Sequence, residues 1–263
     1  MAVGPECRFV AVSGSTETKI WLYDLNNAKR SNQKKVSQPT NGAAVRKLVK
    51  AADAALEVIE GGQFVNYEMN LSPDGKFLSI GSFKKDIRLW GIKYRKPTKR
   101  ETFTGLRYNG VDLLCTVEGA HDTSIATVTF SCDSKYMVSA SQNGVVKAWD
   151  IGQFDFARGK KPEMVMEQDL GIGKIESMVM SYQWDLAAVL NEERKKVFVY
   201  HLKYEKKKMK LHCTFDHVLI DEDDAAGRIN VVKFSPDSMH IAVGTTDGDV
   251  RVYQIPKHKK SSK

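Results

Sequence analysis

The fold of this chain is decided by residues 131–150, which read SCDSKYMVSASQNGVVKAWD. A turn opens this stretch, an apolar strand follows over 136–141, and a polar turn leads to a second strand that ends on Trp149. The same skeleton recurs, and its opening Ser and closing aromatic residue are equally spaced at 72 and 90, 131 and 149, and 235 and 253. Two looser copies, 4 to 23 and 181 to 200, are one residue longer. Because one such unit cannot bury its own apolar face, the copies must stack on one another.

The copy around Trp149 resembles a WD40 repeat. Residues 118–121 (Glu-Gly-Ala-His) resemble the Gly-His element, residues 124–130 the first strand, and Trp149-Asp150 the Trp-Asp dipeptide of that family. The resemblance implies an all-β fold, a WD40-type β-propeller with five recognisable repeats and four strands in each complete blade.

The family also has an internal hydrogen-bonded set of a His, a Ser or Thr, an Asp and the Trp. This chain offers His121, either Ser139 or Ser141, and Trp149, but Asn143 stands where the family has Asp. In the family this set is structural, so the resemblance argues against a catalytic His121. The positions expected to hold the repeats together are Trp90, His121, Ser139, Trp149, Asp150, Asp247 and Tyr253.

The outer strand of each blade is expected after a variable loop, over 54–59, 112–117, 163–167 and 210–215. We expect one repeat array over 1–256, with repeat cores at about 4–25, 62–92, 119–151, 171–202 and 227–255, and a basic tail at 257–263. Residues 41–52 fit either a short helix or a disordered insertion.

Both terminal blades are expected to be incomplete. The first copy starts at its second strand, with too few residues ahead of it for a first one, and the last copy ends at its third strand. This pattern favours an open or partial propeller over a compact ring of five blades.

Composition agrees with a core-forming chain, because 42% of its 263 residues are hydrophobic. No segment approaches the roughly 18 apolar residues of a transmembrane helix, and the N-terminus lacks the features of a signal peptide. The four cysteines show no zinc-site spacing and are expected to be reduced; Cys115, Cys132 and Cys213 are expected to be buried in or between strands. Reduced thiols indicate a reducing compartment, the cytosol or the nucleus, and we expect a cytoplasmic location.

No constellation for catalysis, metal or cofactor binding stands out. Gly171-Ile172-Gly173 is too short for a dinucleotide fingerprint, His212 and His217 point to opposite faces of a strand, and residues 221–224 lack the spacing of a calcium loop. We therefore expect a protein that is not an enzyme and that needs no cofactor or metal.

Charge is more informative, since the formal net charge is +8 and the pI is about 9.1. Basic residues cluster in two segments that also contain Tyr94 and Tyr204, which could stack on bases. The candidates for binding RNA or another polyanion are Lys93, Arg95, Lys96, Lys99, Arg100, Lys206, Lys207, Lys208 and Lys210. The alternative is that these loops are simply solvated and keep sheet edges from pairing.

Within the WD40 class, the Lys-rich segment after Trp90, the run 119–150 and the copy ending at Tyr200 resemble the C-terminal part of the transducin beta-like protein 2 family, over about Cys7 to Ile255. That resemblance implies an adaptor in endoplasmic-reticulum stress signalling, held at that membrane by partners or by an N-terminal anchor that is not among these residues.

Two functions follow as expectations. The first is a non-catalytic scaffold that displays propeller faces to partner proteins; it rests partly on fold-level analogy. The second is an RNA- or ribosome-associated adaptor that uses the Lys-rich loops, and strong salt dependence of binding would distinguish it.

Overall fold

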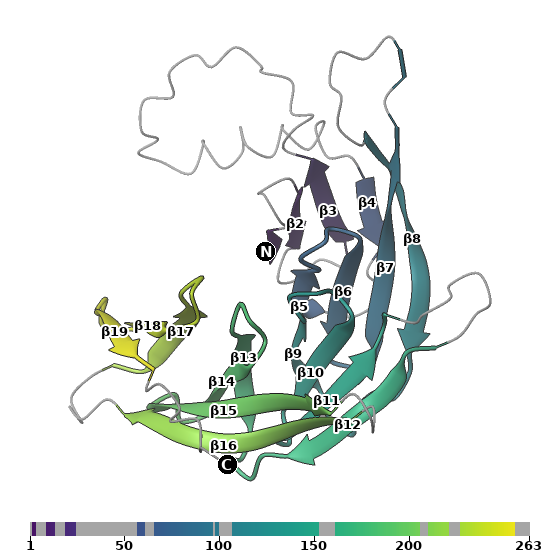
Figure 1. Ribbon diagram of the computed structural model, residues 1–263. Helices are drawn as coiled ribbons and strands as arrows, with labels where there is room; N and C mark the ends of the chain where they lie inside the picture. Colours follow the sequence, from purple (N-terminus) through teal and green to yellow (C-terminus); the bar gives the residue numbers. More distant parts are fainter. Residues whose placement is uncertain are drawn as a thin grey trace, which may run out of the picture.

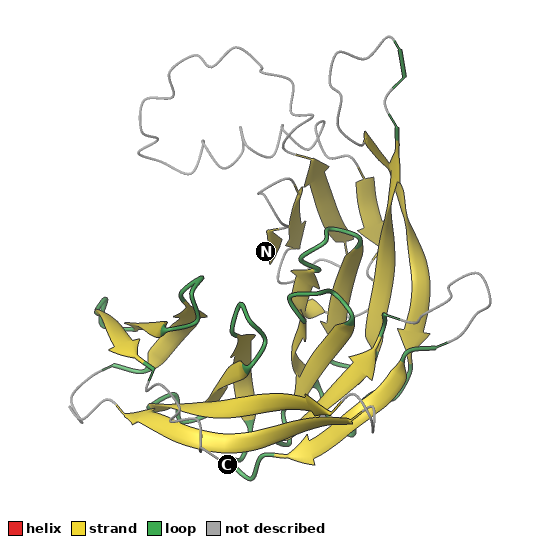
Figure 2. Cartoon of the chain, viewed as in Figure 1, coloured by secondary structure: helices red, strands yellow, loops and turns green. Residues whose placement is uncertain are grey.

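The computed structural model describes residues 2–3, 9–13, 19–24, 57–60, 66–96, 98–99, 107–152, 161–205, 210–220 and 227–255. Throughout these residues the regular structure is β-strand, joined by turns and short loops (Figure 2). The strands form five antiparallel sheets, as the repeats predict.

Each sheet is made of strands that follow one another in the chain. The first sheet contains β1 (Ala2–Val3), β2 (Phe9–Ser13), β3 (Lys19–Asp24) and β4 (Glu57–Glu60). The second contains β5 (Asn66–Leu71), β6 (Phe77–Ser82), β7 (Ile87–Arg95) and β8 (Arg107–Val117). The third contains β9 (Ile125–Phe130), β10 (Tyr136–Ser141), β11 (Val145–Asp150) and β12 (Glu163–Asp169).

The fourth sheet contains β13 (Ile175–Met180), β14 (Leu186–Asn191), β15 (Lys196–Glu205) and β16 (Lys210–Ile220). The fifth has β17 (Ile229–Phe234), β18 (His240–Thr245) and β19 (Val250–Gln254). The sheets follow one another in chain order around an open arc, whose two ends are the first and fifth sheets (Figure 1). Contacts between successive sheets run through their first strands, β1 to β5, β5 to β9, β9 to β13 and β13 to β17.

The strand register repeats from sheet to sheet and explains the aromatic residue that ends each copy. In all five sheets this aromatic lies opposite the second residue of the strand before it. The pairs are Val10 with Tyr23, Leu78 with Trp90, Met137 with Trp149, Ala187 with Tyr200, and Ile241 with Tyr253. The five copies identified in the sequence are therefore five equivalent sheets.

The core lies between the sheets rather than within any one of them. Four apolar clusters join the five sheets in order, and each takes residues from two neighbours. Ile20 and Leu22 of the first sheet meet Leu78 of the second, for example, and Ala188 of the fourth meets Ile241 of the fifth. Each sheet is thus stabilised by its neighbours, as stacked repeats require.

The expectation of two incomplete terminal blades was half right. The first sheet has four strands, because Ala2 pairs with Ala11 and Val3 pairs with Val10. These two residues supply the short first strand, for which the sequence predicts too few residues. The fifth sheet has three strands within the residues that the structure describes, as expected.

Two of the outer strands are clearly longer than predicted, whereas the one predicted over 54–59 is described over Glu57–Glu60. Those predicted over 112–117 and 210–215 run over Arg107–Val117 and Lys210–Ile220, because each continues its pairing with a long third strand, β7 or β15. Residues 93–95 and 203–205, predicted as loops, are therefore strand ends in these two-stranded extensions (Figure 1). The alternatives for residues 41–52 concern a segment outside the described residues.

In the turns after β5, β9, β13 and β17, a Ser hydroxyl donates a hydrogen bond to an Asp carboxylate. Ser72 Oγ lies 2.7 Å from Asp74 Oδ1 and Ser131 Oγ lies 2.6 Å from Asp133 Oδ1, and the Ser181–Asp185 and Ser235–Asp237 pairs make the same contact. Gly75 follows with φ of 71°, as a turn glycine should. These turns fix where each second strand begins.

Candidate interaction site on the innermost strands

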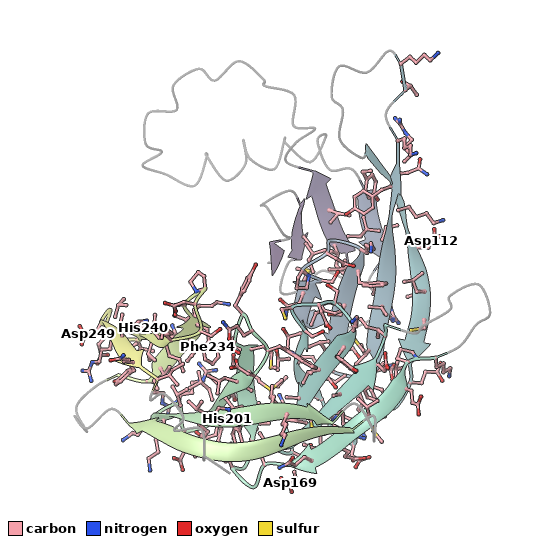
Figure 3. All side chains as sticks on the ribbon, in the orientation of Figure 1. Asp112, Asp169, His201, Phe234, His240 and Asp249 are labelled. Atoms are coloured by element: carbon pink, nitrogen blue, oxygen red, sulfur yellow. The ribbon has the colours of Figure 1, made fainter. Side chains whose placement is uncertain are left out.

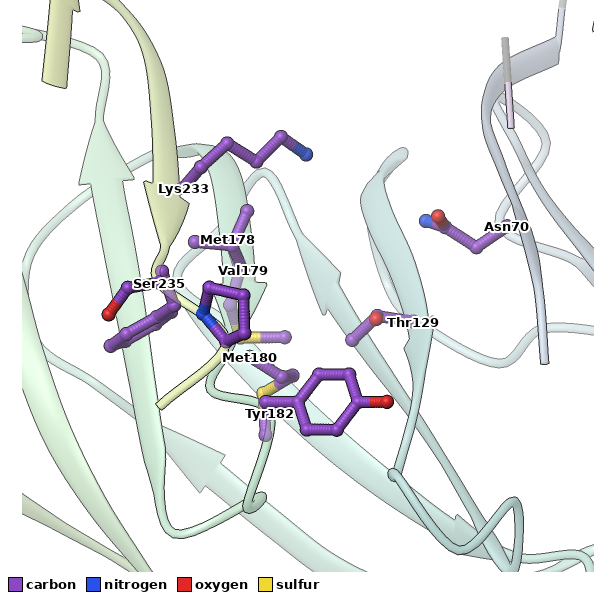
Figure 4. Close-up of a pocket in the computed structure, with 10 residues that line it drawn as sticks. Asn70, Thr129, Met178, Val179, Met180, Tyr182, Lys233 and Ser235 are labelled. Carbon is purple, nitrogen blue, oxygen red and sulfur yellow. The ribbon is translucent and has the colours of Figure 1, made fainter. Parts of the chain in front are cut away.

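A pocket of about 250 Å³ opens between the innermost strands of four sheets (Figure 4). Its walls come from β5, β9, β13 and β17 and from the turns that follow the last two. The lining residues are Asn70, Thr129, Met178, Val179, Met180, Tyr182, Lys233, Phe234, Ser235 and Pro236. The pocket therefore exists only because these four sheets stand around a common centre.

Register explains why these side chains meet. Asn70 pairs with Ser79, Thr129 with Val138, Val179 with Ala188 and Lys233 with Ala242. Each of these partners directly follows the residue that lies opposite the closing aromatic. The four lining residues thus occupy one equivalent position in four successive sheets, filled in turn by an amide, a hydroxyl, an aliphatic group and an ammonium.

Polar and apolar side chains alternate around the pocket. Lys233 and Asn70 lie on opposite sides of it, and Met178, Met180 and Tyr182 lie between them (Figure 4). Phe234, labelled in Figure 3, lies on β17, where it lines the pocket and is also partly buried against the core between the fourth and fifth sheets. The Asn70 amide nitrogen donates to the Val128 carbonyl at 2.6 Å, which ties β5 to β9 beside the opening.

The residues of the predicted internal set come together in the third sheet. His121 Nε2 lies 2.7 Å from Ser139 Oγ, and Trp149 Nε1 donates to the same oxygen at 3.0 Å. Ser139, not Ser141, is therefore the shared partner; Ser141 Oγ lies 2.6 Å from Asn143 Oδ1. His121 Nδ1 is buried without a hydrogen-bond partner among the described residues, and burial lowers the pKa of His121 to about 4.

The other expected structural positions differ in burial. Trp90 and Asp150 are buried, and the Asp150 carboxylate accepts from the Gly152 amide at 2.8 Å. Tyr253 is half-buried against the core between the fourth and fifth sheets, whereas Asp247 is exposed. The assigned role of these residues in holding the repeats together stays a prediction.

The basic candidates that the structure describes lie on the extension of β7. Lys93, Arg95, Lys96 and Lys99 are exposed there, and Lys93 forms an ion pair with Asp112 of β8 (Figure 3). Tyr94 is half-buried and donates its hydroxyl to the Gly75 carbonyl, so its ring belongs to the packing around the second sheet. The side chains of Arg100, Lys206, Lys207, Lys208, Lys210 and Tyr204 lie outside the described residues.

Two cysteines are described, and both are free thiols. Cys115 is half-buried, and burial raises its pKa to about 11. Cys132 is exposed, so the prediction that it is buried was wrong: it sits in the turn just before Asp133, where side chains point to solvent. Cys213 is paired in β16, but its side chain is outside the description.

Within the described part of the chain, no three His, Cys, Asp or Glu side chains gather as metal ligands would, and none of its segments forms a helix able to cross a membrane.

The sequence analysis missed the pocket residues Asn70, Thr129 and Lys233. A signal for them was present: each stands two positions before the turn Ser of its copy, at Ser72, Ser131 and Ser235. Superposing the copies on that Ser would have placed the three side chains at one level.

Comparison with known proteins agrees with this geometry. The family model described as "WD domain, G-beta repeat" matches residues 112–150 and 216–254. Each match starts within an outer strand, β8 or β16, and runs through the three inner strands of the next sheet. The repeat unit of the family is therefore one strand out of phase with the sheets.

Two curated relatives show distant similarity. Target of rapamycin complex subunit LST8 of Saccharomyces cerevisiae is 22% identical over 194 residues, covering 74% of this chain and 52% of the relative. Transducin beta-like protein 2 of Homo sapiens is 27% identical over 96 residues, covering 36% of this chain and 19% of the relative. The second similarity confirms the expected resemblance at a distance, over fewer residues than the expected span from about Cys7 to Ile255.

A chain in the crystal structure of the mitotic checkpoint complex superposes with a TM-score of 0.59 at 12% identity, covering 96% of this chain and 62% of that one. At this identity the likeness shows the fold. The chain spans about half or less of these two curated relatives and under two thirds of the solved chain.

Proposed function

Because this chain belongs to the WD40-repeat family, we propose that it is a non-catalytic scaffold that holds partner proteins on its inner and outer surfaces. Proteins of this family are generally scaffolds for protein interaction. The observation that carries the proposal is the pocket between Asn70, Thr129, Tyr182 and Lys233, which is open and is assembled from four separate sheets. A surface of this kind suits the display of fixed side chains to a partner rather than a covalent step.

One arrangement near the pocket has the residue types of a hydrolase triad and is better explained by structure. Ser235 contacts Asp237, and His240 Nδ1 lies 3.9 Å from that carboxylate. The Ser–Asp contact, however, recurs at Ser72, Ser131 and Ser181, where it closes the same turn. In this turn Ser235 Oγ also accepts the His240 amide at 3.0 Å, so the hydroxyl is a turn cap and not an activated nucleophile.

The finer expectation is an adaptor role in endoplasmic-reticulum stress signalling, in a protein that is cytoplasmic or associated with that membrane through partners. It is supported by the similarity to transducin beta-like protein 2. Imaging the tagged full-length protein against an endoplasmic-reticulum marker tests it. A purely diffuse signal, unchanged by a stress-inducing agent, would exclude this role and leave the general scaffold function in place.

A second candidate function, binding of RNA or the ribosome, is favoured by the exposed cations Lys96 and Lys99 at the tip of the β7 extension. Such a cluster attracts phosphate through counterion release. The ion pair between Lys93 and Asp112 and the packed ring of Tyr94 weaken the case at that site, because they remove one free charge and one stacking surface.

The experiment that separates the two functions is affinity purification of the tagged protein from its own cells, with and without nuclease. Protein partners that survive nuclease support the scaffold. If every partner disappears with nuclease, the scaffold proposal fails and the basic segments become the binding surface.

A charge-reversal variant sharpens the result. Replacing Lys206, Lys207 and Lys208 together with Glu should leave nuclease-resistant partners bound if the protein is a scaffold. The matched control reverses Lys174, Lys195 and Lys196, which changes the net charge equally elsewhere on the fourth sheet. Loss of RNA from the first variant alone would assign RNA binding to residues 206–208.

A further inference from the structure

We propose that the pocket between Asn70, Thr129, Tyr182 and Lys233 binds a peptide segment of a partner protein in which a carboxylate side chain stands directly beside a bulky apolar one. This inference rests on the scaffold function and names the chemistry that its central surface recognises. It depends on three observations, the size and lining of the pocket, the free hydrogen-bond donors around it, and its charge.

The size and lining suit a short apolar anchor. A volume of about 250 Å³ lies just below the roughly 300–1,000 Å³ that is typical of pockets for whole small molecules. It therefore suits one or two side chains of a peptide. Met178, Met180 and Phe234 supply apolar surface, and the unbranched methionines can adapt to the shape of an aliphatic or aromatic side chain.

Three donors around this apolar surface have no partner in the described part of the chain. The hydroxyls of Thr129 and Tyr182 make no hydrogen bond there, and the Lys233 ammonium makes no ion pair. Tyr182 is 71% exposed, so its hydroxyl stands at the opening of the pocket. Two hydroxyl donors and one ammonium around a single space suit an acceptor that can take several hydrogen bonds at once, as a carboxylate does.

The charge of the pocket points the same way. None of the residues that line it is acidic, and the carboxylate of Asp237, which directly follows the lining residue Pro236, accepts hydrogen bonds from the Ser235 hydroxyl and from the Met239 amide at 2.9 Å. The Lys233 charge is thus uncompensated in a chain that already carries +8. A positively charged pocket associates faster with an acidic peptide and repels a basic one. The charge of the pocket therefore selects against a basic peptide.

The order of the residues sets the spacing between the two groups of the peptide. Lys233 and Phe234 are consecutive residues of β17 that both line the pocket, where the ammonium supplies charge and the ring supplies apolar surface. A short peptide segment can contact both the Lys233 ammonium and the Phe234 ring when its carboxylate and apolar side chains are close in sequence. A glutamate next to a leucine is the simplest pair that meets this requirement.

Fluorescence anisotropy with labelled decapeptides tests the inference. The probe is a glycine–serine peptide with one central glutamate–leucine pair, compared with the same peptide carrying glutamine–leucine or glutamate–alanine. We expect the first to bind and each of the others to bind about three- to tenfold more weakly, because each removes one of the two interactions. Raising the salt concentration should weaken the first peptide most, since its attraction to Lys233 is screened.

Protein variants locate the binding. Lys233→Glu should weaken the glutamate–leucine peptide about tenfold, since it turns an attraction into a repulsion. Lys196→Glu, an equal charge change at an exposed residue of β15, should leave binding unchanged. Thr129→Val keeps the side-chain shape and should cost about two- to fivefold. Circular dichroism confirms that the variants fold; both lysines are exposed, so neither change removes core packing.

Equal affinity for all three peptides, or the same affinity in Lys233→Glu and wild type, would overturn the inference. Displacement of the peptide by a short single-stranded RNA, lost in Lys233→Glu, would overturn it in favour of a nucleic-acid site. If affinity purification returns the same nuclease-resistant partners with wild type and Lys233→Glu while the peptide fails to bind, the pocket inference falls and the scaffold function stands. If it returns no protein partner, the scaffold function itself falls.

Discussion

The backbone amide of Asp74 donates a hydrogen bond of 3.1 Å to the hydroxyl of Ser134, which joins the β5–β6 turn of the second sheet to the β9–β10 turn of the third. The same link recurs between the fourth and fifth sheets, where the Gln183 amide donates to Ser238 Oγ at 3.3 Å. Between the third and fourth sheets, Trp184 takes the position of the Ser and stacks on Tyr136 with ring centroids 5.2 Å apart. The third residue after the turn Ser thus connects neighbouring sheets, either through a hydrogen bond to a Ser hydroxyl or through an aromatic stack.

The first prediction concerns Ser134, whose backbone has φ of 57° and which is buried in its turn. Ser134→Ala should lower the free energy of unfolding by about 1 kcal/mol, because it removes the acceptor of the Asp74 amide and keeps the left-handed backbone. Ser134→Gly removes the same acceptor but relieves a backbone strain of about 1 kcal/mol, so its stability should stay close to wild type. Urea unfolding measures both.

If alanine and glycine destabilise equally at this position, backbone strain does not matter there. If neither destabilises, the hydrogen bond between the two turns contributes nothing.

The second prediction concerns the buried ring of Trp149. Trp149→Ala should destabilise the protein by roughly 3–5 kcal/mol, because it opens a cavity in the core between the second and third sheets. Trp149→Phe keeps most of the ring but loses the donor to Ser139, and it should cost about 1–2 kcal/mol. A loss below about 1 kcal/mol for alanine in urea melts would mean that the ring is not packed as the structure has it.

The third prediction concerns pH and His121. Burial lowers its pKa from 6.5 to about 4 in the folded protein, so between these values the unfolded chain binds a proton that the folded one does not. The stability contributed by neutral His121 is therefore complete above about pH 6.5, and it decreases as the pH falls towards 4. The total loss is of the order of 3 kcal/mol.

The control is His121→Leu, which cannot titrate. Its free energy of unfolding, followed by urea melts from pH 7.5 to 4.5, should fall less steeply than that of wild type, since other groups still titrate in both. Identical slopes would show that His121 becomes protonated in the folded state at its ordinary pKa.

The fourth prediction compares two glycines with left-handed backbones. Gly144 has φ of +92°, and a Cβ there would lie 2.9 Å from the Gly173 carbonyl oxygen in the loop of the next sheet. Gly119 has φ of +58° and open space around it. Gly144→Ala should therefore cost about 2–3 kcal/mol and Gly119→Ala only about 1 kcal/mol, measured by thermal or urea unfolding. Equal losses would mean that the close approach of Gly173 is relieved by a small loop movement.

Much of the fold could be predicted because its signals are local. The strand over 136–141 was predicted with its observed bounds, since a Ser–Asp turn precedes it, and the next strand, predicted to end on Trp149, runs one residue further to Asp150. The choice of Ser139 over Ser141 needed the fold, because the two side chains share a face and only distance separates them. The length of β8 was missed for a similar reason: residues 107–111 form a strand only because they pair with the end of β7.

The candidate site could be predicted only in part. The basic residues of 93–99 are visible in the sequence, but the ion pair between Lys93 and Asp112 and the packing of Tyr94 arise from pairing across β7 and β8. Asn70, Thr129 and Lys233 have little in common as side chains, and they become one surface only when four sheets share a register. A comparison of the repeats identifies residue types that recur, so it does not detect a position whose side chain differs in every repeat.

The open end of the arc has a consequence for local opening. Among the described residues, the fifth sheet packs against one neighbouring sheet, and its Val250 and Val252 are 74% and 65% exposed. Amide hydrogens there depend on the contacts of a single neighbour, whereas those of the third sheet are enclosed from both sides. Hydrogen–deuterium exchange should consequently be faster in β19 and β18 than in β10, and any molecule that covers the exposed valines would slow exchange first in β19.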